Sequence, residues 1–166
     1  MMMKGLSLWQ PWASLIATGA KRYETRSWPT NYRGPLLICA AKGGLPKREL
    51  ADLLRQKEFR MGLSPVKGQP LSLAAETWAG VWAEDLPFGK AVAVVDLINC
   101  YPTENVKIPP LDYERLYGDF TPGRYAWKLD NVRALREPIP VKGAQGLFDV
   151  DESVVSEIMR TRWIHR

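Results

Sequence analysis

Histidine, cysteine and long apolar runs are all scarce in this sequence. One histidine, His165, and two cysteines, Cys39 and Cys100, are present among 166 residues. A Ser-His-Asp triad or a structural zinc site is therefore not expected, and we predict neither a metal nor another cofactor. With no secretory context, the cysteines are interpreted as reduced core residues rather than a disulfide. No apolar run reaches the eighteen residues of a membrane span, and the first residues do not resemble a signal peptide, so we expect a cytoplasmic protein without membrane contact.

The length and the pattern of elements predict one α+β domain covering residues 1–166, since no repeat, low-complexity tract or linker is evident. The oligomeric state is left open by the sequence, although a monomer is favoured. Net charge is +5 but unevenly spread. Up to residue 60, eleven Lys and Arg face four Asp and Glu, whereas the remainder is slightly acidic. This asymmetry favours an anionic partner such as RNA, and the other explanation is a solvated basic surface.

The most informative stretch runs from Gly19 to Arg26. A short strand is predicted at residues 6–9, followed by a helix that opens at Gln10-Pro11-Trp12 and ends at Gly19. From residue 22 the period changes to two, which places Glu24 and Arg26 on one face of a strand. Lys21 can join that face only if the turn before the strand kinks.

The rest of the chain is interpreted in order from its apolar periodicity. We expect strands at residues 35–41, 91–100 and 124–130, and a strand pair or irregular edge at 132–141. Helices are expected at residues 46–59 and 151–163, with a helical turn at 111–117 and a loop at 143–148. Residues 61–90 are interpreted as a helical insertion that contains a short helix at 73–82.

Asp96 interrupts the most apolar of these strands. A buried carboxylate needs a partner, so Lys21 or Arg26 is the expected one. The alternative is that Asp96 lies on the solvent face of its strand.

The pattern Gly-x-Lys-x-x-Glu-x-Arg at Gly19–Arg26 resembles the signature of the ASCH domain family, a branch of the PUA-like proteins. The segments at residues 6–13, 34–38, 123–127 and 146–148 are also similar to that family. The similarity covers most of residues 4–150, and its most specific part is the first forty residues. It implies a small PUA-like β-barrel of five to six strands with peripheral helices, and a cleft beside the motif suited to RNA or a nucleoside.

Binding of RNA or a modified nucleoside is the preferred interpretation. Lys21 or Arg26 would contact a phosphate and Glu24 a base edge or a sugar hydroxyl, while a tryptophan would stack on the base. The expected ligand-binding residues are Trp9, Gln10, Trp12, Lys21, Glu24, Arg26 and Trp28.

Three other interpretations of the motif stay open. Some small bacterial relatives are amidohydrolases that deacetylate acetylcytidine, and the resemblance then assigns catalysis to Lys21, Glu24 and Asp96. Glu24 stands where those enzymes have threonine, and the later glutamate is here Asp96. A ribonuclease is the second alternative, for which Glu24 and Asp96 are the only plausible metal carboxylates. Finally, Lys21, Glu24 and Arg26 could form a purely structural ion-pair cluster.

Overall fold

The computed structural model describes residues 2–64, 85–161 and 163–165. A single curled sheet contains the strands β1 (Lys4–Leu8), β2 (Tyr23–Arg26), β3 (Gly34–Ala40), β4 (Lys90–Pro102), β5 (Tyr125–Pro140), β6 (Leu147–Asp149) and β7 (Trp163–His165). Its helices are α1 (Trp12–Ala17), α2 (Lys47–Arg55), α3 (Lys57–Gly62) and α4 (Glu152–Arg160), with 3-10 turns η3 (Thr103–Asn105) and η4 (Tyr113–Leu116). The predicted α+β class is confirmed.

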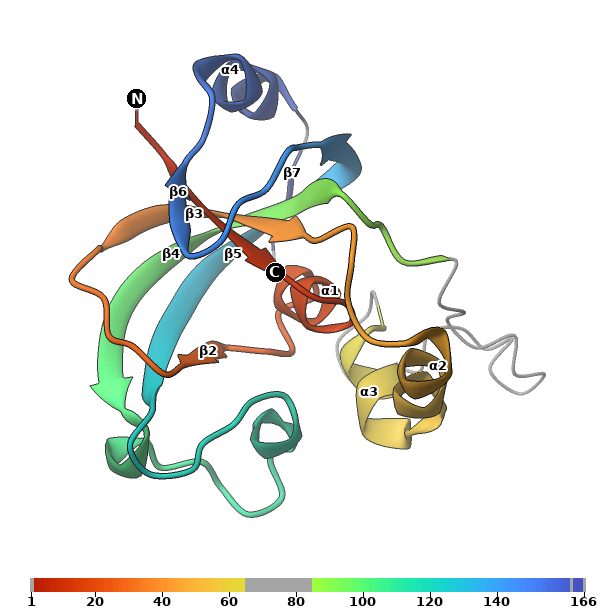
Figure 1. Ribbon diagram of the computed structural model, residues 1–166, viewed down its shortest axis with the longest axis vertical. Coiled ribbons are helices and arrows are strands. Elements are labelled where there is room, and N and C mark those ends of the chain that lie inside the picture. The colour runs from red at the N-terminus through yellow and green to blue at the C-terminus, as the bar shows by residue number, and fades with distance from the viewer. Residues whose placement is uncertain (1, 65–84, 162, 166) are drawn as a thin grey trace.

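The strand order is β2-β5-β4-β3-β1-β6, and β7 pairs with β5 beside this path. Only β1 and β3 pair in parallel among the described strands. The sheet curls into a half-barrel with α1 inside the curl, as Figure 1 shows. The predicted barrel-like fold is therefore found, and its curled sheet ends in β2 and β6.

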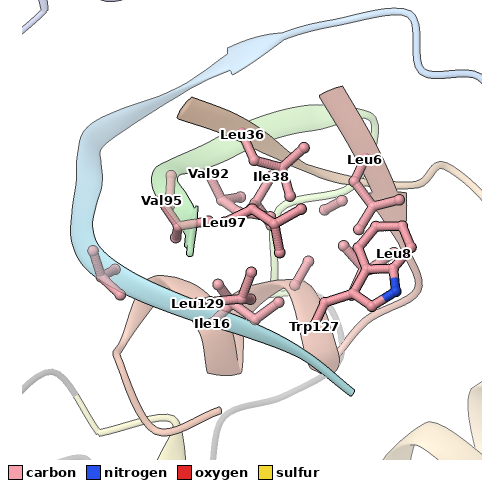
Figure 2. Close-up of a cluster of buried hydrophobic side chains, with 14 residues drawn as sticks. Leu6, Leu8, Ile16, Leu36, Ile38, Val92, Val95, Leu97, Trp127 and Leu129 are labelled. Carbon is pink, nitrogen blue, oxygen red and sulfur yellow. The ribbon is translucent and has the colours of Figure 1, made fainter. Parts of the chain in front are cut away.

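The strand β3 is buried on both faces because each face meets a different core. Leu36 and Ile38 face the concave side, where α1 adds Ile16 and β5 adds Trp127 (Figure 2). The alternate residues of β3 face the second cluster, which α4 covers with Val155 and Ile158. Full burial of such an aliphatic side chain contributes about 1.5–3 kcal/mol. The continuous apolar run at residues 35–41 is thus explained by helices on both faces.

Several boundaries differ from the predicted ones. The helix expected at residues 46–59 is two helices, α2 and α3, because Gln56 adopts an extended backbone with ψ 133°. The segments expected at 124–130 and 132–141 are one strand, β5, which passes through Asn131 at φ 49°. The expected loop at 143–148 ends in β6.

The C-terminal helix is shorter than predicted and ends at Arg160. Thr161 is extended, and residues 163–165 then pair with β5, whose backbone groups they satisfy. The predicted helix at 73–82 lies outside the described residues. Within the described ranges, no helix is long and apolar enough to cross a bilayer.

Candidate functional site

The end of α1 positions the first charge of the motif. Thr18 caps the helix and Gly19 has φ 81°, a left-handed conformation that glycine adopts without strain. The chain then turns back, so that the Lys21 amide donates to the Leu15 carbonyl at 3.0 Å. Lys21 is only 2% exposed, and its Nζ lies 3.5 Å from Glu24 Oε2. The kink required to bring Lys21 to the Glu24 side is therefore present.

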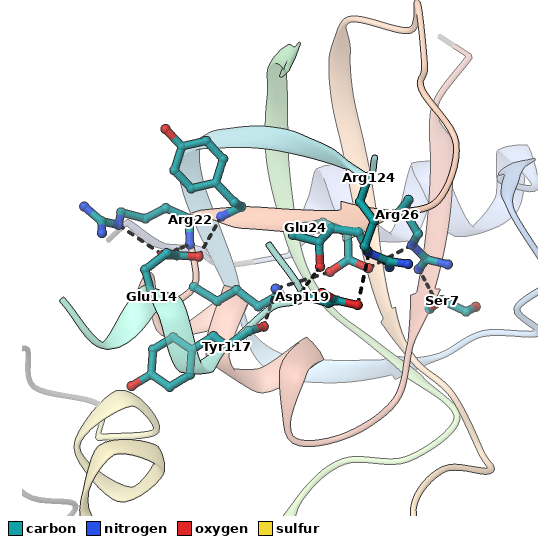
Figure 3. A network of polar contacts seen from close by, with 11 residues as sticks. Ser7, Arg22, Glu24, Arg26, Glu114, Tyr117, Asp119 and Arg124 are labelled. Carbon is teal, nitrogen blue, oxygen red and sulfur yellow. Dashed lines mark hydrogen bonds and ion pairs between the residues drawn. The ribbon is translucent and has the colours of Figure 1, made fainter. Parts of the chain in front are cut away.

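Glu24 and Arg26 share a face of β2, as the period of two predicted. Arg26 Nε donates to Glu24 Oε1 at 2.8 Å, and its Nη2 reaches the Ser7 carbonyl at 3.4 Å. Figure 3 shows this cluster beside β1. The two oxygens of Glu24 are thus held by Lys21 on one side and by Arg26 on the other.

The loop after η4 supplies partners that the sequence did not reveal. The Tyr117 carbonyl accepts a hydrogen bond from Lys21 Nζ at 2.6 Å. Asp119 lies 3.3 Å from Arg124 Nε, and Arg124 Nη2 also reaches the Thr25 carbonyl at 3.5 Å (Figure 3). A second wall of mixed charge therefore faces the motif.

Glu114, in η4, anchors this loop to the start of β2. Its fully buried carboxylate accepts from the backbone amides of Arg22 and Tyr23, at 2.8 and 3.0 Å, and from Arg22 Nε at 3.2 Å. Burial raises the pKa of Glu114 above its usual value, although these hydrogen bonds and the nearby Lys21 oppose that shift. No sequence pattern marks Glu114, because its partners are backbone groups about ninety residues away.

Between the two walls lies a cleft of about 690 Å³. It is lined by Ser7, Leu8, Trp9, Trp12, Lys21, Glu24, Thr25, Arg26, Ser27, Trp28, Leu116, Tyr117, Gly118, Asp119 and Arg124. Trp9, Trp12 and Trp28 are thus all in the lining, as their expected roles require. Trp9 is 53% exposed, whereas Trp28 packs edge-on to the core residue Trp127 with ring centroids 4.7 Å apart.

Gln10 does not line this cleft, contrary to prediction. Its buried side chain donates from Nε2 to Ser14 Oγ and to the Pro87 carbonyl, both at 2.8 Å. Its Oε1 accepts from the Ser14 amide at 3.1 Å. The amide group of Gln10 is therefore occupied in joining the first turn of α1 to the segment before β4.

Asp96 is also absent from the cleft lining, and the expected pairing with Lys21 or Arg26 is wrong. Its carboxylate accepts from Arg133 Nη2 at 2.5 Å and from Asn131 Nδ2 at 2.8 Å, both on β5. The neighbouring Leu97 is buried in the concave core, so Asp96 lies on the opposite face of β4. Asp96 is partly exposed, which agrees with the alternative interpretation that it lies on the solvent face of its strand.

The described residues that line the cleft carry three cations, Lys21, Arg26 and Arg124, and two carboxylates, Glu24 and Asp119. Such a set can bind a ligand that carries both hydrogen-bond donors and an anionic group. Within the described part of the chain, no three His, Cys, Asp or Glu side chains form a group able to hold a metal ion.

Comparisons with known proteins agree with this fold. A family model described as ASCH domain matches residues 6–139. The crystal structure of ASCH from Zymomonas mobilis aligns with a TM-score of 0.52 and 14% identity, covering 96% of each chain. A mutant of that protein aligns with a TM-score of 0.51 and 14% identity, covering 96% of this chain and 99% of the mutant chain.

Two curated relatives are similar in sequence. Activating signal cointegrator 1 from Homo sapiens is 28% identical over 151 residues, and its Mus musculus counterpart is 27% identical over the same length. The alignments cover 90% of this chain but 22% of each relative. The chain thus spans about a fifth of the length of these relatives.

Proposed function

This chain belongs to the ASCH domain family, and from that premise we propose that it binds RNA or a modified nucleoside in the cleft beside the Gly19–Arg26 motif. One observation carries the proposal: the Glu24 carboxylate is fixed between Lys21 and Arg26 in the lining of a cleft that also contains three tryptophans. A fixed acceptor beside aromatic rings is the combination that recognises an unpaired base.

The charged groups divide into supporting and contacting ones. The Lys21 side chain is almost fully buried, donates to the Tyr117 carbonyl and forms an ion pair with Glu24, so it orients Glu24 rather than reaching a phosphate. The side chains of Arg26 and Arg124 are 25% and 29% exposed, which leaves guanidinium N–H groups for an anionic ligand. We therefore assign phosphate contact to the two arginines.

Glu24 is the group that would discriminate between bases. A carboxylate accepts a hydrogen bond from an exocyclic amino group such as the N4 amine of cytosine, and it repels a carbonyl at that position. One well-formed contact of this kind supplies about 1–3 kcal/mol of discrimination. Stacking on Trp9, Trp12 or Trp28 adds affinity without selecting a base.

An amidohydrolase acting on acetylated cytidine-type nucleosides is the second candidate, favoured by the closeness of Lys21 Nζ and Glu24 Oε2 within the cleft. Lys21 Nζ is already held by the Tyr117 carbonyl and by Glu24, so we assign it no nucleophilic attack. Glu24 would instead accept a proton from a water that attacks the amide carbonyl, and would give it to the amine nitrogen as the C–N bond breaks to release acetate and the free amine, while Lys21 would hold Glu24 in position. For the ribonuclease alternative, the two carboxylates that it needs lie apart, since Glu24 lines the cleft and Asp96 pairs with Arg133 on the other face of β4.

Calorimetric titration with the four nucleosides, acetylcytidine and a short RNA tests the binding proposal. We expect Glu24→Gln to weaken binding of the nucleoside with the preferred base by roughly tenfold. Arg26→Ala should weaken binding of the RNA, and this loss should depend on salt concentration. Glu137→Gln and Arg136→Ala are matched controls, because both side chains are exposed on β5 and absent from the cleft lining. No binding of any ligand to the wild type would refute the proposal.

A chromatographic assay of acetylcytidine incubated with the protein tests the enzyme alternative. Consumption of acetylcytidine by the wild type, but not by Glu24→Gln, would make the protein an amidohydrolase. If acetylcytidine binds but is not consumed at protein concentrations near its own, the amidohydrolase alternative is rejected.

A further inference from the structure

A second hollow, here called the groove, adjoins the cleft. Its volume is about 1080 Å³. It shares Ser7, Trp9, Arg26 and Trp28 with the cleft, so the two hollows have a common wall. The remaining lining comes from the end of β3 and the residues after it, from Gly89, from the last residue of β5, Pro140, and from the loop at residues 141–146 between β5 and β6.

The groove differs from the cleft in its charge. Among the described residues, its lining contains Arg26, Lys42 and Lys142 but no aspartate or glutamate. Both lysines are exposed, and within the described ranges neither forms an ion pair. The cleft, in contrast, balances its cations with Glu24 and Asp119. The groove is therefore suited to a chain of negative charges that continues from the cleft.

Close backbone packing fixes the two walls of the groove. A Cβ atom at Gly89, whose φ is 65°, would lie 2.8 Å from Lys42 Cγ, so the lysine stem lies directly on this glycine. The Val141 amide donates to the Gly89 carbonyl at 3.2 Å, which ties the start of the loop to the same point. A Cβ at Gly143 would lie 2.1 Å from Ser7 Oγ, so the loop also packs against β1. These contacts place Lys42 and Lys142 on one continuous surface.

We propose that the groove binds the sugar-phosphate backbone of a single-stranded RNA whose leading base occupies the cleft. This inference rests on the proposed function and deepens it, because it makes the ligand a strand rather than a free nucleoside. A base can enter the cleft only when it is unpaired, which requires a single strand at that point. Trp9, which is 53% exposed at the shared wall, offers a stacking surface between the two hollows. Lys42 and Lys142 would bind the phosphates of the strand, since a lysine binds a phosphate as a point charge.

The test measures the affinity of the wild type and of the double variant Lys42→Ala/Lys142→Ala for two kinds of ligand. These are a mixed-sequence heptaribonucleotide and the four nucleoside monophosphates. We expect roughly tenfold weaker binding of the heptanucleotide, about threefold for each lysine contact. The slope of log affinity against log salt should fall by about 1.4, since each phosphate contact on a single strand contributes about 0.7. Affinity for the preferred monophosphate should change less than twofold. Lys107→Ala/Arg160→Ala removes the same charge away from both hollows and should leave all values unchanged.

The outcomes separate the groove from the cleft. An unchanged heptanucleotide affinity and salt slope in the lysine variant would overturn the groove assignment, even if Glu24→Gln and Arg26→Ala still weaken binding. Loss in the lysine variant, with no effect of Glu24→Gln, which lies in the cleft alone, would keep the groove and refute the proposed function. Binding of a polyglutamate peptide, but no RNA, to the wild type would refute both and identify a protein-binding surface.

Discussion

Replacing Lys21 by methionine should destabilise the fold strongly, because methionine keeps the apolar stem but removes a buried charge. Removing one partner from a buried ion pair costs about 3–5 kcal/mol. Glu24 retains Arg26 at 2.8 Å, which favours the lower end of that range. The Tyr117 carbonyl loses its 2.6 Å donor, which adds about 1 kcal/mol. We therefore expect a loss of about 4 kcal/mol in the free energy of unfolding.

Urea denaturation at pH 7, followed by tryptophan fluorescence and by circular dichroism, measures this loss. A protein of this size should also show a melting temperature roughly 12 °C lower. Lys107→Met is the matched control, since Lys107 is exposed and its replacement should change stability by less than about 0.5 kcal/mol.

Adding Glu24→Gln to the methionine variant distinguishes a buried charge pair from a simple packing effect. Without the charge on Glu24, the loss of Lys21 should matter less, so the two substitutions should be non-additive by about 1–3 kcal/mol. A loss below 1 kcal/mol for Lys21→Met, or strict additivity in the double variant, would show that the ion pair does not stabilise the site.

Two further predictions concern residues outside the charged cluster. Burial raises the pKa of Cys39 to about 12, so brief iodoacetamide treatment at pH 8 should alkylate the half-buried Cys100 before Cys39, as peptide mass spectrometry would show. Equal alkylation of both thiols in the folded protein would contradict the expected protection of Cys39. The stability that the neutral Cys39 thiol contributes is present below its ordinary pKa of 9.0 and is lost as pH rises towards 12. Gly62→Ala should destabilise the protein by about 1–3 kcal/mol and weaken nucleoside binding, because the new Cβ would lie 2.4 Å from Tyr117 Oη. An unchanged urea midpoint would show that Tyr117 moves freely.

The motif could be predicted from the sequence because local rules govern it. A glycine ends α1, and a period of two places Glu24 and Arg26 together. The position of Lys21 was predictable only as a condition on the turn, since it depends on one left-handed residue.

The opposite wall of the cleft could not be predicted, because it is reached through long-range contacts. Lys21 bonds to the carbonyl of Tyr117, 96 residues away, and a backbone acceptor leaves no signature in residue type. Glu114 likewise binds backbone amides. Asp119 lies in a stretch without periodicity, where no face can be assigned, and it pairs with Arg124, the first residue of the strand expected at 124–130.

Asp96 was misplaced for a related reason. The strand around it is apolar on both faces, because α1 covers one and α4 the other, so periodicity does not reveal which face Asp96 occupies. Gln10 was misassigned because its neighbours Trp9 and Trp12 do line the cleft. Its hydrogen bond to the Pro87 carbonyl depends on a segment 77 residues later.

The pairing of β1 with β6 has a consequence for how the protein is made. Lys4 and Asp149 are bonded across 145 residues of chain, and Gly143 packs on Ser7 at the shared wall of the two hollows. Topologies with such high contact order fold slowly, because distant segments must meet before their contacts form. During synthesis, β1 emerges from the ribosome long before β6, so the groove can form only after nearly all of this sequence has been translated. Binding competence should therefore be acquired late and in one step, rather than growing with the nascent chain.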